Sequence, residues 1–262
     1  MNKIFCLIVI LPLTLQFWGC KKNEPQNSIG PTSTENYFPN NEGTNYKYTY
    51  ERIDSSGQTN GNRISYYLGN QTIGATPYRL QVDSLLASSF SQVDTSFFRK
   101  TQFSGVYYYL DTLGFSATIK DSALASLIPF LLFDTEYLAY RNSMPVGIFW
   151  PVFKVNLNYG GTLTTIVDVA AATESMETIT LNLNTGQTNK EALRIKYTMV
   201  LRSDSTQAST KSFFAKAWLV SNIGPVRWEG NESLVNVLTG SGLDLRDTAA
   251  VVKQSLIDYQ IK

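Results

Sequence analysis

The chain has no histidine in its 262 residues and only two cysteines, Cys6 and Cys20. Without histidine it lacks the usual general base, the Ser-His-Asp arrangement and the commonest zinc ligand. It also has no G-x-S-x-G, S-x-x-K, phosphate-loop or G-x-G-x-x-G motif. These absences predict a protein that is not an enzyme and binds no metal or cofactor.

Charge is scarce as well, because charged residues make up 16% of the chain against about 25% in an average domain. If Lys3 is removed with a signal peptide, 21 basic and 21 acidic residues remain. A nucleic-acid partner requires a surplus of basic side chains, so none is expected. Balanced charge likewise disfavours a polybasic attachment to anionic lipids.

The N-terminus has the layout of a bacterial lipoprotein signal over residues 1–19. Lys3 gives the positive start, Ile4 to Leu15 form an apolar run too short to span a bilayer, and Gly19 precedes Cys20. We expect Cys20 to carry the lipid that attaches the protein to the membrane. Cys6 then leaves with the signal, so neither a disulfide nor a cysteine metal site remains.

Residues 20–36 are polar, contain proline and glycine, and have no apolar period, which predicts a flexible tether. The sixteen residues after Cys20 have a mean reach of about 20–24 Å. Residues 37–262 are predicted to form a single β domain, since β architectures often exceed 200 residues undivided.

Short segments with period two follow Tyr37. Turn signals such as Ser56-Gly57, Tyr159-Gly160-Gly161 and Thr185-Gly186 separate them, which predicts an antiparallel meander. The expected fold is mainly β: one large curved antiparallel sheet, a half-barrel or open barrel, with one or two short helices. The expected strands include 46–51, 64–68, 78–83, 90–98, 106–110, 115–119, 152–157, 163–170, 176–183, 193–202, 212–220, 225–229 and 233–238.

Two segments depart from the strand pattern. Residues 121–128 predict a short capped helix that ends near Pro129, within an apolar stretch reaching Phe133. This stretch either completes the core or forms a plug over the concave face of the sheet. At the C-terminus, 247–257 predict a short helix that runs into a final edge strand.

Three stretches resemble a family of Bacteroidota lipoproteins without an assigned activity. Residues 37–48 resemble its Tyr-Phe-Pro…Gly opening, with Tyr46 where tryptophan is usual. Residues 145–150 resemble a Pro…Gly…Trp element, and 218–228 a late hairpin from which Asn222 and Ile223 depart. The resemblance implies a curved sheet similar in outline to the half-barrel lipoprotein carriers of the Lol system, and it implies no catalytic residues.

Aromatic residues suggest where a ligand would bind. Alternate residues on a strand share a face, so grouped tyrosines could form an aromatic concave surface for a lipid, an apolar ligand or a sugar ring. The alternative is cross-strand packing in the core. The candidate ligand-binding residues are Tyr46, Tyr48, Tyr50, Tyr107, Tyr109 and Trp150.

Catalysis would have to use paired carboxylates, as in glycosidases. The pairs close in sequence are Glu174 with Glu177, Asp134 with Glu136, and Asp244 with Asp247. They are expected in loops or strand ends, where solvated surface is the default.

Five Asp-Ser or Asp-Thr pairs resemble the O-glycosylation acceptor motif of Bacteroidota periplasmic proteins. Asp-Ser is also ordinary turn and cap chemistry, so both interpretations stay open. The candidate acceptors are Ser84, Thr112, Ser122, Ser205 and Thr248.

Together these features predict a lipid-anchored, non-enzymatic binding or carrier protein of the cell envelope, in the outer membrane, holding an apolar or glycan ligand on a concave sheet. The alternatives are an assembly component of an outer-membrane protein complex and a carboxylate-based glycan hydrolase. Surface-exported lipoproteins of Bacteroidota tend to carry acids after the cysteine. Here Lys21-Lys22-Asn23 comes first, which favours the periplasmic side.

Overall fold

Alternating burial along the first strand shows how this sequence builds a sheet. Tyr46, Tyr48 and Tyr50 are buried, whereas Thr49 between them is exposed. Side chains on a strand point alternately to its two faces, so the tyrosines define an inner face and their neighbours an outer one. The computed structural model describes residues 35–102, 105–110, 128–202, 210–241 and 249–262. The predicted signal and nearly all of the predicted tether lie outside these residues.

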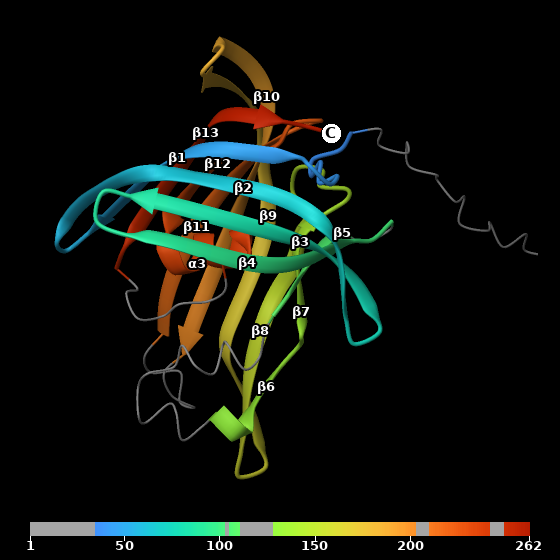
Figure 1. Cartoon of the computed structure of the whole chain (residues 1–262). Helices are drawn as coiled ribbons and strands as arrows, with labels where there is room; N and C mark the ends of the chain where they lie inside the picture. Colours follow the sequence, from blue (N-terminus) through green and yellow to red (C-terminus); the bar gives the residue numbers. More distant parts are fainter. Residues whose placement is uncertain (1–34, 103–104, 111–127, 203–209, 242–248) are drawn as a thin grey trace, which may run out of the picture. The chain divides into compact units, whose positions relative to one another are not determined.

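The described residues form one antiparallel sheet in the order β6-β8-β9-β10-β11-β12-β13-β1-β2-β3-β4-β5-β7. Most neighbours in the sheet are also neighbours in sequence (Figure 1). The elements are β1 (Asn45–Asp54), β2 (Gly57–Ile73), β3 (Thr76–Ala87), β4 (Ser91–Lys100), β5 (Gly105–Tyr109), η1 (Ile128–Phe130), β6 (Leu131–Phe133), β7 (Glu136–Arg141), β8 (Phe149–Tyr159), β9 (Thr162–Leu183), β10 (Gly186–Arg202), β11 (Thr210–Val220), β12 (Gly224–Asn231), α3 (Glu232–Thr239) and β13 (Val251–Gln260).

This architecture confirms the predicted fold class, a mainly β chain with one large open antiparallel sheet and a short helix. The turns at Ser56-Gly57, Gly160-Gly161 and Thr185-Gly186 join consecutive strands as expected. The strand predicted at 115–119 and the helix predicted at 121–128 fall on residues that the structure does not describe, except for Ile128, which begins η1.

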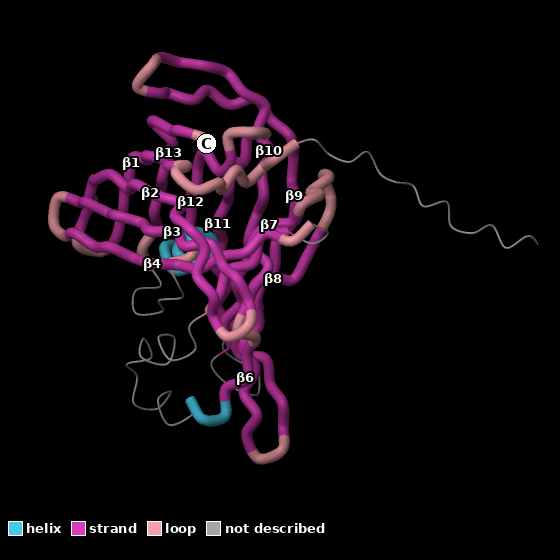
Figure 2. Tube along the Cα trace, turned by 45° about the vertical axis from the view of Figure 1, so that its right-hand side comes forward, coloured by secondary structure: helices cyan, strands magenta, loops and turns pink. Residues whose placement is uncertain are grey.

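The α-helix of the described chain is α3, which lies against the inner face of the sheet (Figure 2). Leu234 and Leu238 are fully buried. Tyr137 of β7 donates to the Val237 carbonyl at 2.6 Å, and Gln81 of β3 donates to the Thr239 carbonyl at 3.0 Å. The same helix contacts β11, β12 and β13. The sheet therefore curves around α3.

The predicted strand at 233–238 is wrong, because these residues form α3. Asn231 caps the helix by accepting a hydrogen bond from the Leu234 amide at 3.3 Å, and Gly240 ends it with a left-handed φ of 86°. Asparagine before and glycine after a short apolar segment are helix signals in the sequence itself. Its apolar residues also lie on one side of the helix, so the helical period is present in the sequence, but a short segment with two valines suits a strand as well.

The predicted helix at 247–257 is also wrong within the described residues, since β13 is a strand. Val252, Gln254 and Leu256 are buried on one face of β13 while Val251 and Lys253 are exposed. The predicted C-terminal strand is present, but it lies inside the sheet and not at its edge. It pairs with β1 on one side and β12 on the other.

The stretches that carry the family resemblance have structural roles. The Tyr46 hydroxyl donates to the Pro39 carbonyl at 2.9 Å, and a Cβ on Gly224 would lie 3.0 Å from that hydroxyl. Trp150 and Trp228, in the other two stretches, are buried in the core.

Gly240 allows a sharp stability test, because it has left-handed φ and close neighbours. A Cβ there would lie 2.6 Å from Tyr108 Cε1 and 2.7 Å from Ser96 Oγ. We expect Gly240→Ala to lower the free energy of unfolding by about 2–4 kcal/mol, from backbone strain and overpacking. Gly74 is the matched control, since its φ is 61° and no atom lies within 4 Å of its Cβ position. Gly74→Ala should cost only ~1–2 kcal/mol in urea unfolding, and equal costs would contradict the overpacking argument.

Candidate functional site

The inner face holds most of the predicted aromatic residues as packed core. Tyr46, Tyr48, Tyr50 and Trp150 each have 4% or less of their surface exposed. Tyr48 donates to the Pro225 carbonyl at 3.0 Å and packs edge-on against Trp228. Burial raises the pKa of its phenol well above the ordinary value. These contacts support the core-packing interpretation for this group, and a ligand role for them stays a prediction.

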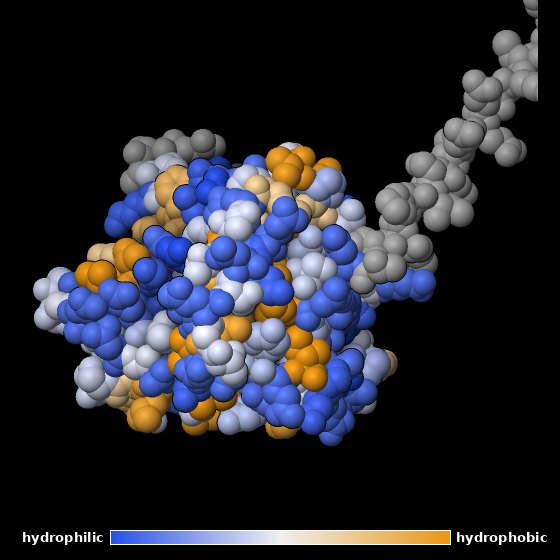
Figure 3. Space-filling view, turned by 90° about the horizontal axis from the view of Figure 1, so that it is seen from above, coloured by the Kyte–Doolittle hydropathy of each residue, from blue (hydrophilic) through white to orange (hydrophobic). Residues whose placement is uncertain are grey.

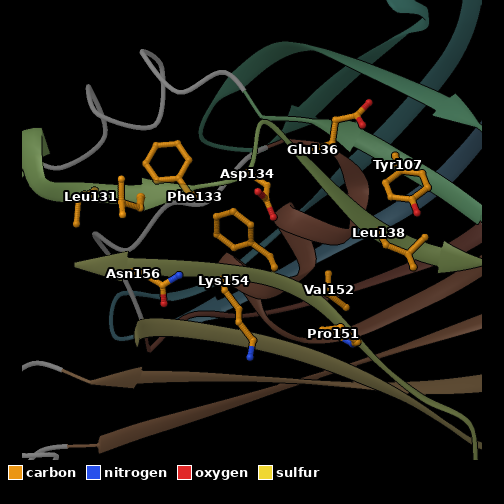
Figure 4. A pocket seen from close by; sticks show the side chains of 12 residues that line it. Tyr107, Leu131, Phe133, Asp134, Glu136, Leu138, Pro151, Val152, Lys154 and Asn156 are labelled. Atoms are coloured by element: carbon orange, nitrogen blue, oxygen red, sulfur yellow. The ribbon is translucent and has the colours of Figure 1, made fainter. Parts of the chain in front are cut away.

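A cavity of about 770 Å³ lies instead at the seam where the two ends of the sheet approach each other. β7 is a terminal strand, and β6 pairs only with Val155–Leu157 of β8. Residues Phe149–Lys154 of β8 therefore pair with β9 alone. Figure 4 shows the side chains that line this seam cavity: Tyr107, Leu131, Leu132, Phe133, Asp134, Glu136, Leu138, Pro151, Val152, Phe153, Lys154 and Asn156.

The apolar part of the seam cavity comes from three strands. Leu138 of β7 and Phe133 of β6 are half-buried, whereas Val152 and Phe153 of β8 are buried. Phe153 also packs edge-on against Tyr137, with ring centres 5.9 Å apart. Val152 and Phe153 also belong to the hydrophobic core, so one wall of the seam cavity is the edge of that core.

One polar corner of the seam cavity is fixed by a hydrogen-bonded cluster. Glu136 accepts from both Arg99 Nε and Nη2 at 2.5 Å and from the Tyr78 hydroxyl at 2.5 Å. The hydrogen bonds from Arg99 are the main cause that lowers the pKa of Glu136 below its usual value. The Arg99 guanidinium also lies 4.8 Å from the centre of the Tyr107 ring. The charge of the Glu136 carboxylate is therefore balanced by Arg99, and its position is fixed by three hydrogen bonds. It differs in this from a free general acid or base.

A second set of polar groups lies along the open side. Lys154 is half exposed and its ammonium lies 3.7 Å from the Asp168 carboxylate, while Asp134 is exposed. Asn156 accepts a hydrogen bond from Thr165 at 2.8 Å. The seam cavity is thus amphipathic, with apolar walls and charged groups at its mouth.

Of the aromatic candidates, only Tyr107 lines the seam cavity. Tyr109 is half-buried and packs against Tyr78 and Phe97. Leu138 and Phe153 were missed because β7 and β8 meet without pairing, which leaves no local pattern in the sequence. Residues 131–133 could be noticed in the sequence, because they end the apolar stretch that predicted either a part of the core or a plug.

The carboxylate pairs take structural positions where they are described. Glu174 and Glu177 lie within β9, not in a loop, and both bond Arg194, at 3.0 and 2.8 Å. Glu177 also accepts from the Trp218 indole at 2.5 Å. Asp134 and Glu136 share the seam cavity, whereas Asp244 and Asp247 lie outside the described residues.

Among the proposed glycan acceptors only Ser84 is described. It is half-buried in the middle of β3, opposite Ile64 and Val93. The preceding Asp83 belongs to a buried ion pair with Arg63. Thr112, Ser122, Ser205 and Thr248 lie outside the described residues, and modification of any acceptor stays a prediction.

The described part of the chain was considered for metal-ligand groups and for membrane-spanning helices, and it contains neither. No group of three or more His, Cys, Asp or Glu residues in it could hold a metal ion. None of its helices has both the length and the apolar character needed to cross a membrane.

Comparisons with known proteins give a similarity in fold. No protein-family model matches the sequence, and no curated protein matches it significantly. One similar crystal structure is described as a candidate lipoprotein from Parabacteroides distasonis, at 13% identity and TM-score 0.45. Another is described as a candidate exported protein with a YmcC-like fold from Bacteroides fragilis, at 14% identity and TM-score 0.44. Each alignment covers 86% of this chain and 99% of the other.

Proposed function

We propose that this chain is a non-enzymatic binding protein of the cell envelope, anchored by a lipid on Cys20. It takes an amphipathic ligand with an apolar chain into the seam cavity. The observation that carries this proposal is the cavity itself, because its volume of about 770 Å³ falls in the usual range for small-molecule sites. The lipoprotein signal supports the location, and the resemblance to half-barrel carriers supports a carrier role.

We place the ligand in the seam cavity, not on the concave face that the sequence predicted. The concave face is filled by α3 and the buried tyrosines, so a ligand there would have to displace close-packed core. The seam cavity already offers Leu131, Leu138 and Phe153 to an apolar chain. Lys154 and Asp134 at its mouth would face the polar end of the same molecule.

An apolar chain fits this seam better than a glycan. Sugar rings are recognised by stacking on open aromatic faces, and Tyr107 is the tyrosine available here. The Arg99 guanidinium covers one face of the Tyr107 ring, which leaves at most one face for stacking. The lining is otherwise aliphatic or phenylalanine on its apolar side.

Within the described residues, β7 and residues 149–154 of β8 each have one edge without a strand partner, which favours a second candidate, a protein partner in an outer-membrane complex. An exposed edge can accept an extended segment of another chain by strand addition. Pro151 removes one backbone donor from β8, so β7 is the better edge for such a partner. A stoichiometric envelope protein that co-purifies and is lost on Leu138→Pro would favour this candidate.

Ligand binding is tested by placing a charge in the seam cavity. The full chain, in amphipol, is titrated with 11-(dansylamino)undecanoic acid, a fluorescent fatty acid. We expect Leu138→Arg to weaken binding of this probe at least tenfold, because the apolar wall is lost and a cation is brought into it.

The matched control is Leu86→Arg, the same substitution at a residue of β3 that is 63% exposed and does not line the seam cavity. It should leave the affinity for the probe unchanged. Equal probe affinity in the wild type and Leu138→Arg would overturn the proposal. Unfolding curves for both variants show whether any loss reflects misfolding.

A further inference from the structure

An uncharged, apolar tip lies at the end of the sheet where β8 turns into β9. We define the apolar tip as residues 128–133, which form η1 and β6, and residues 155–167 of the β8–β9 hairpin. Neither segment contains a charged residue. Figures 1 and 2 both show this hairpin and η1 projecting beyond the neighbouring strands.

Large hydrophobic side chains of the apolar tip face solvent. Leu163 is 63% exposed, Tyr159 59%, Leu132 49% and Phe130 40%. The Phe130 and Tyr159 rings pack edge to face, with centres 5.3 Å apart, so the two segments form one surface. By contrast, the face of the molecule in Figure 3 carries hydrophobic residues as separate small groups among hydrophilic ones. A contiguous exposed apolar surface marks a site of interaction with a partner or a membrane.

The distribution of charge around the apolar tip fits a lipid bilayer. On β8 and β9 the nearest charged residues are Lys154 and Asp168, which pair with each other at 3.7 Å. Asp134 follows Phe133 directly, and Arg202 of β10 donates to the Thr165 carbonyl at 3.3 Å, so charged groups border the base of the apolar tip. Tyr159 lies five residues beyond Lys154, which is about 17 Å along a strand. Interfacial elements bury their apolar side only ~5–10 Å into a bilayer. The apolar tip could reach that depth with the charged pair still in water.

The apolar tip is continuous with the seam cavity. Leu131, Leu132 and Phe133 belong to both, because β6 forms the boundary between them. A bilayer that receives the apolar tip would therefore meet one wall of the seam cavity directly.

We propose that the apolar tip inserts into the surface of a lipid bilayer and brings the seam cavity to the membrane that supplies or receives its ligand. The insertion stands on the apolar tip alone, whereas the exchange of a ligand rests on the proposed function. Tyr159 is suited to the headgroup level, where amphipathic rings gather. Gly160 and Gly161, with φ of 60° and 78°, make the tight turn that leads the chain back.

The test compares two threonines at hairpin turns. Thr162 follows Gly161 in the apolar tip, and Thr185 precedes Gly186 in the β9–β10 turn, and both are exposed. Each is changed to cysteine in the full chain and labelled with the polarity-sensitive dye NBD. The chain without an introduced cysteine is the blank. The proteins are reconstituted in vesicles of phosphatidylethanolamine and phosphatidylglycerol.

We expect the label at Thr162→Cys to gain several-fold in fluorescence and to be quenched by brominated acyl chains, and the label at Thr185→Cys to show neither effect. Adding Tyr159→Ser and Leu163→Ser should reduce the gain at Thr162→Cys to the level of the control. Indistinguishable signals from the two labels would overturn the inference. A gain that depends on protein concentration and needs no vesicles would also overturn it, by showing that a second copy covers the apolar tip.

The outcomes separate this inference from the proposed function. Probe binding that is lost in Leu138→Arg, together with a label at position 162 that stays in water, would reject membrane insertion alone. Insertion without probe binding would reject the seam cavity as a ligand site and leave the apolar tip as a membrane contact.

Discussion

Raising the pH through the range of about 10–12, above the ordinary tyrosine pKa, is expected to unfold the β domain in one cooperative transition. The reason is the number of tyrosines whose phenols lie in the core. Burial is the largest cause that raises the pKa of each of them, and it raises the pKa of Tyr140 to about 12. The buried tyrosines with raised pKa are Tyr46, Tyr48, Tyr50, Tyr67, Tyr108, Tyr137, Tyr140 and Tyr197.

The direction follows from proton linkage. The folded pKa lies above the unfolded value near 10, so the folded state keeps phenolic protons that the unfolded state releases. The stability from these protons is complete below about pH 10 and is lost as the pH rises towards the folded pKa values. Each tyrosine loses about 1.4 kcal/mol per pH unit, so eight lose on the order of 11 kcal/mol by about pH 11. Whole domains are stable by only ~5–15 kcal/mol.

Tyrosinate absorbance and far-ultraviolet ellipticity, followed together, test this expectation. Both signals should change over the same narrow range of pH. The Tyr197→Phe variant should release about one proton fewer in the transition. Tyr159→Phe is the control, because that side chain is 59% exposed. Between about pH 6 and 8, where histidine titrates, stability should stay flat, since the chain has none. Ionisation of the eight buried tyrosines at native ellipticity would contradict the argument.

Breaking the buried ion pair of Arg63 and Asp83 is expected to destabilise the domain more than any exposed pair could. Arg63 Nη2 lies 2.7 Å from Asp83 Oδ1, and both side chains are at most 5% exposed. The guanidinium also donates to Gln254 at 3.0 Å, and Gln81 donates to Asp83 at 2.6 Å. This network closes the C-terminal end of α3, since Gln81 also bonds the Thr239 carbonyl.

Arg63→Met should lower the free energy of unfolding by about 3–5 kcal/mol, because it leaves the Asp83 carboxylate buried and without its countercharge. Asp83→Leu should cost a similar amount, and the double variant less than the sum of the two, since both charges are then removed. Lys154→Met is the control for a half-exposed pair, with an expected cost of ~1 kcal/mol or less. Urea unfolding measures all four variants, and additive costs would contradict the argument.

The strands and most turns were predictable because their signals are local. Tyr46, Tyr48 and Tyr50 alternate with polar residues, and Gly160-Gly161 supplies the left-handed φ that the β8–β9 turn requires. The helix at Glu232–Thr239 was mistaken for a strand, although Asn231 and Gly240 are visible caps. Leu234, Val235, Val237 and Leu238 keep the spacing of an amphipathic helix, but a segment of only eight residues with two valines also suits a strand.

The candidate site was predictable only in fragments. Tyr107 and the apolar residues 131–133 drew notice in the sequence, but nothing joined them to Leu138 or Phe153. The seam cavity forms because β7 and β8, which are joined by a short connection, do not pair and lie at opposite ends of the sheet order. The order of strands in a sheet depends on long-range pairing, which residue alternation does not encode.

By itself the sequence determined the class of chain and much of its chemistry: a mainly β protein without histidine, balanced in charge, with an aromatic alternation that forms strands and an N-terminus that predicts a lipoprotein signal. These properties depend on composition and on neighbours along the chain. The tertiary structure alone decided that most of the aromatic candidates are buried in the core, and that the cavity lies at the seam beside an uncharged apolar tip. Both result from closing one sheet around a helix, which brings together residues far apart in sequence and buries one face of every strand.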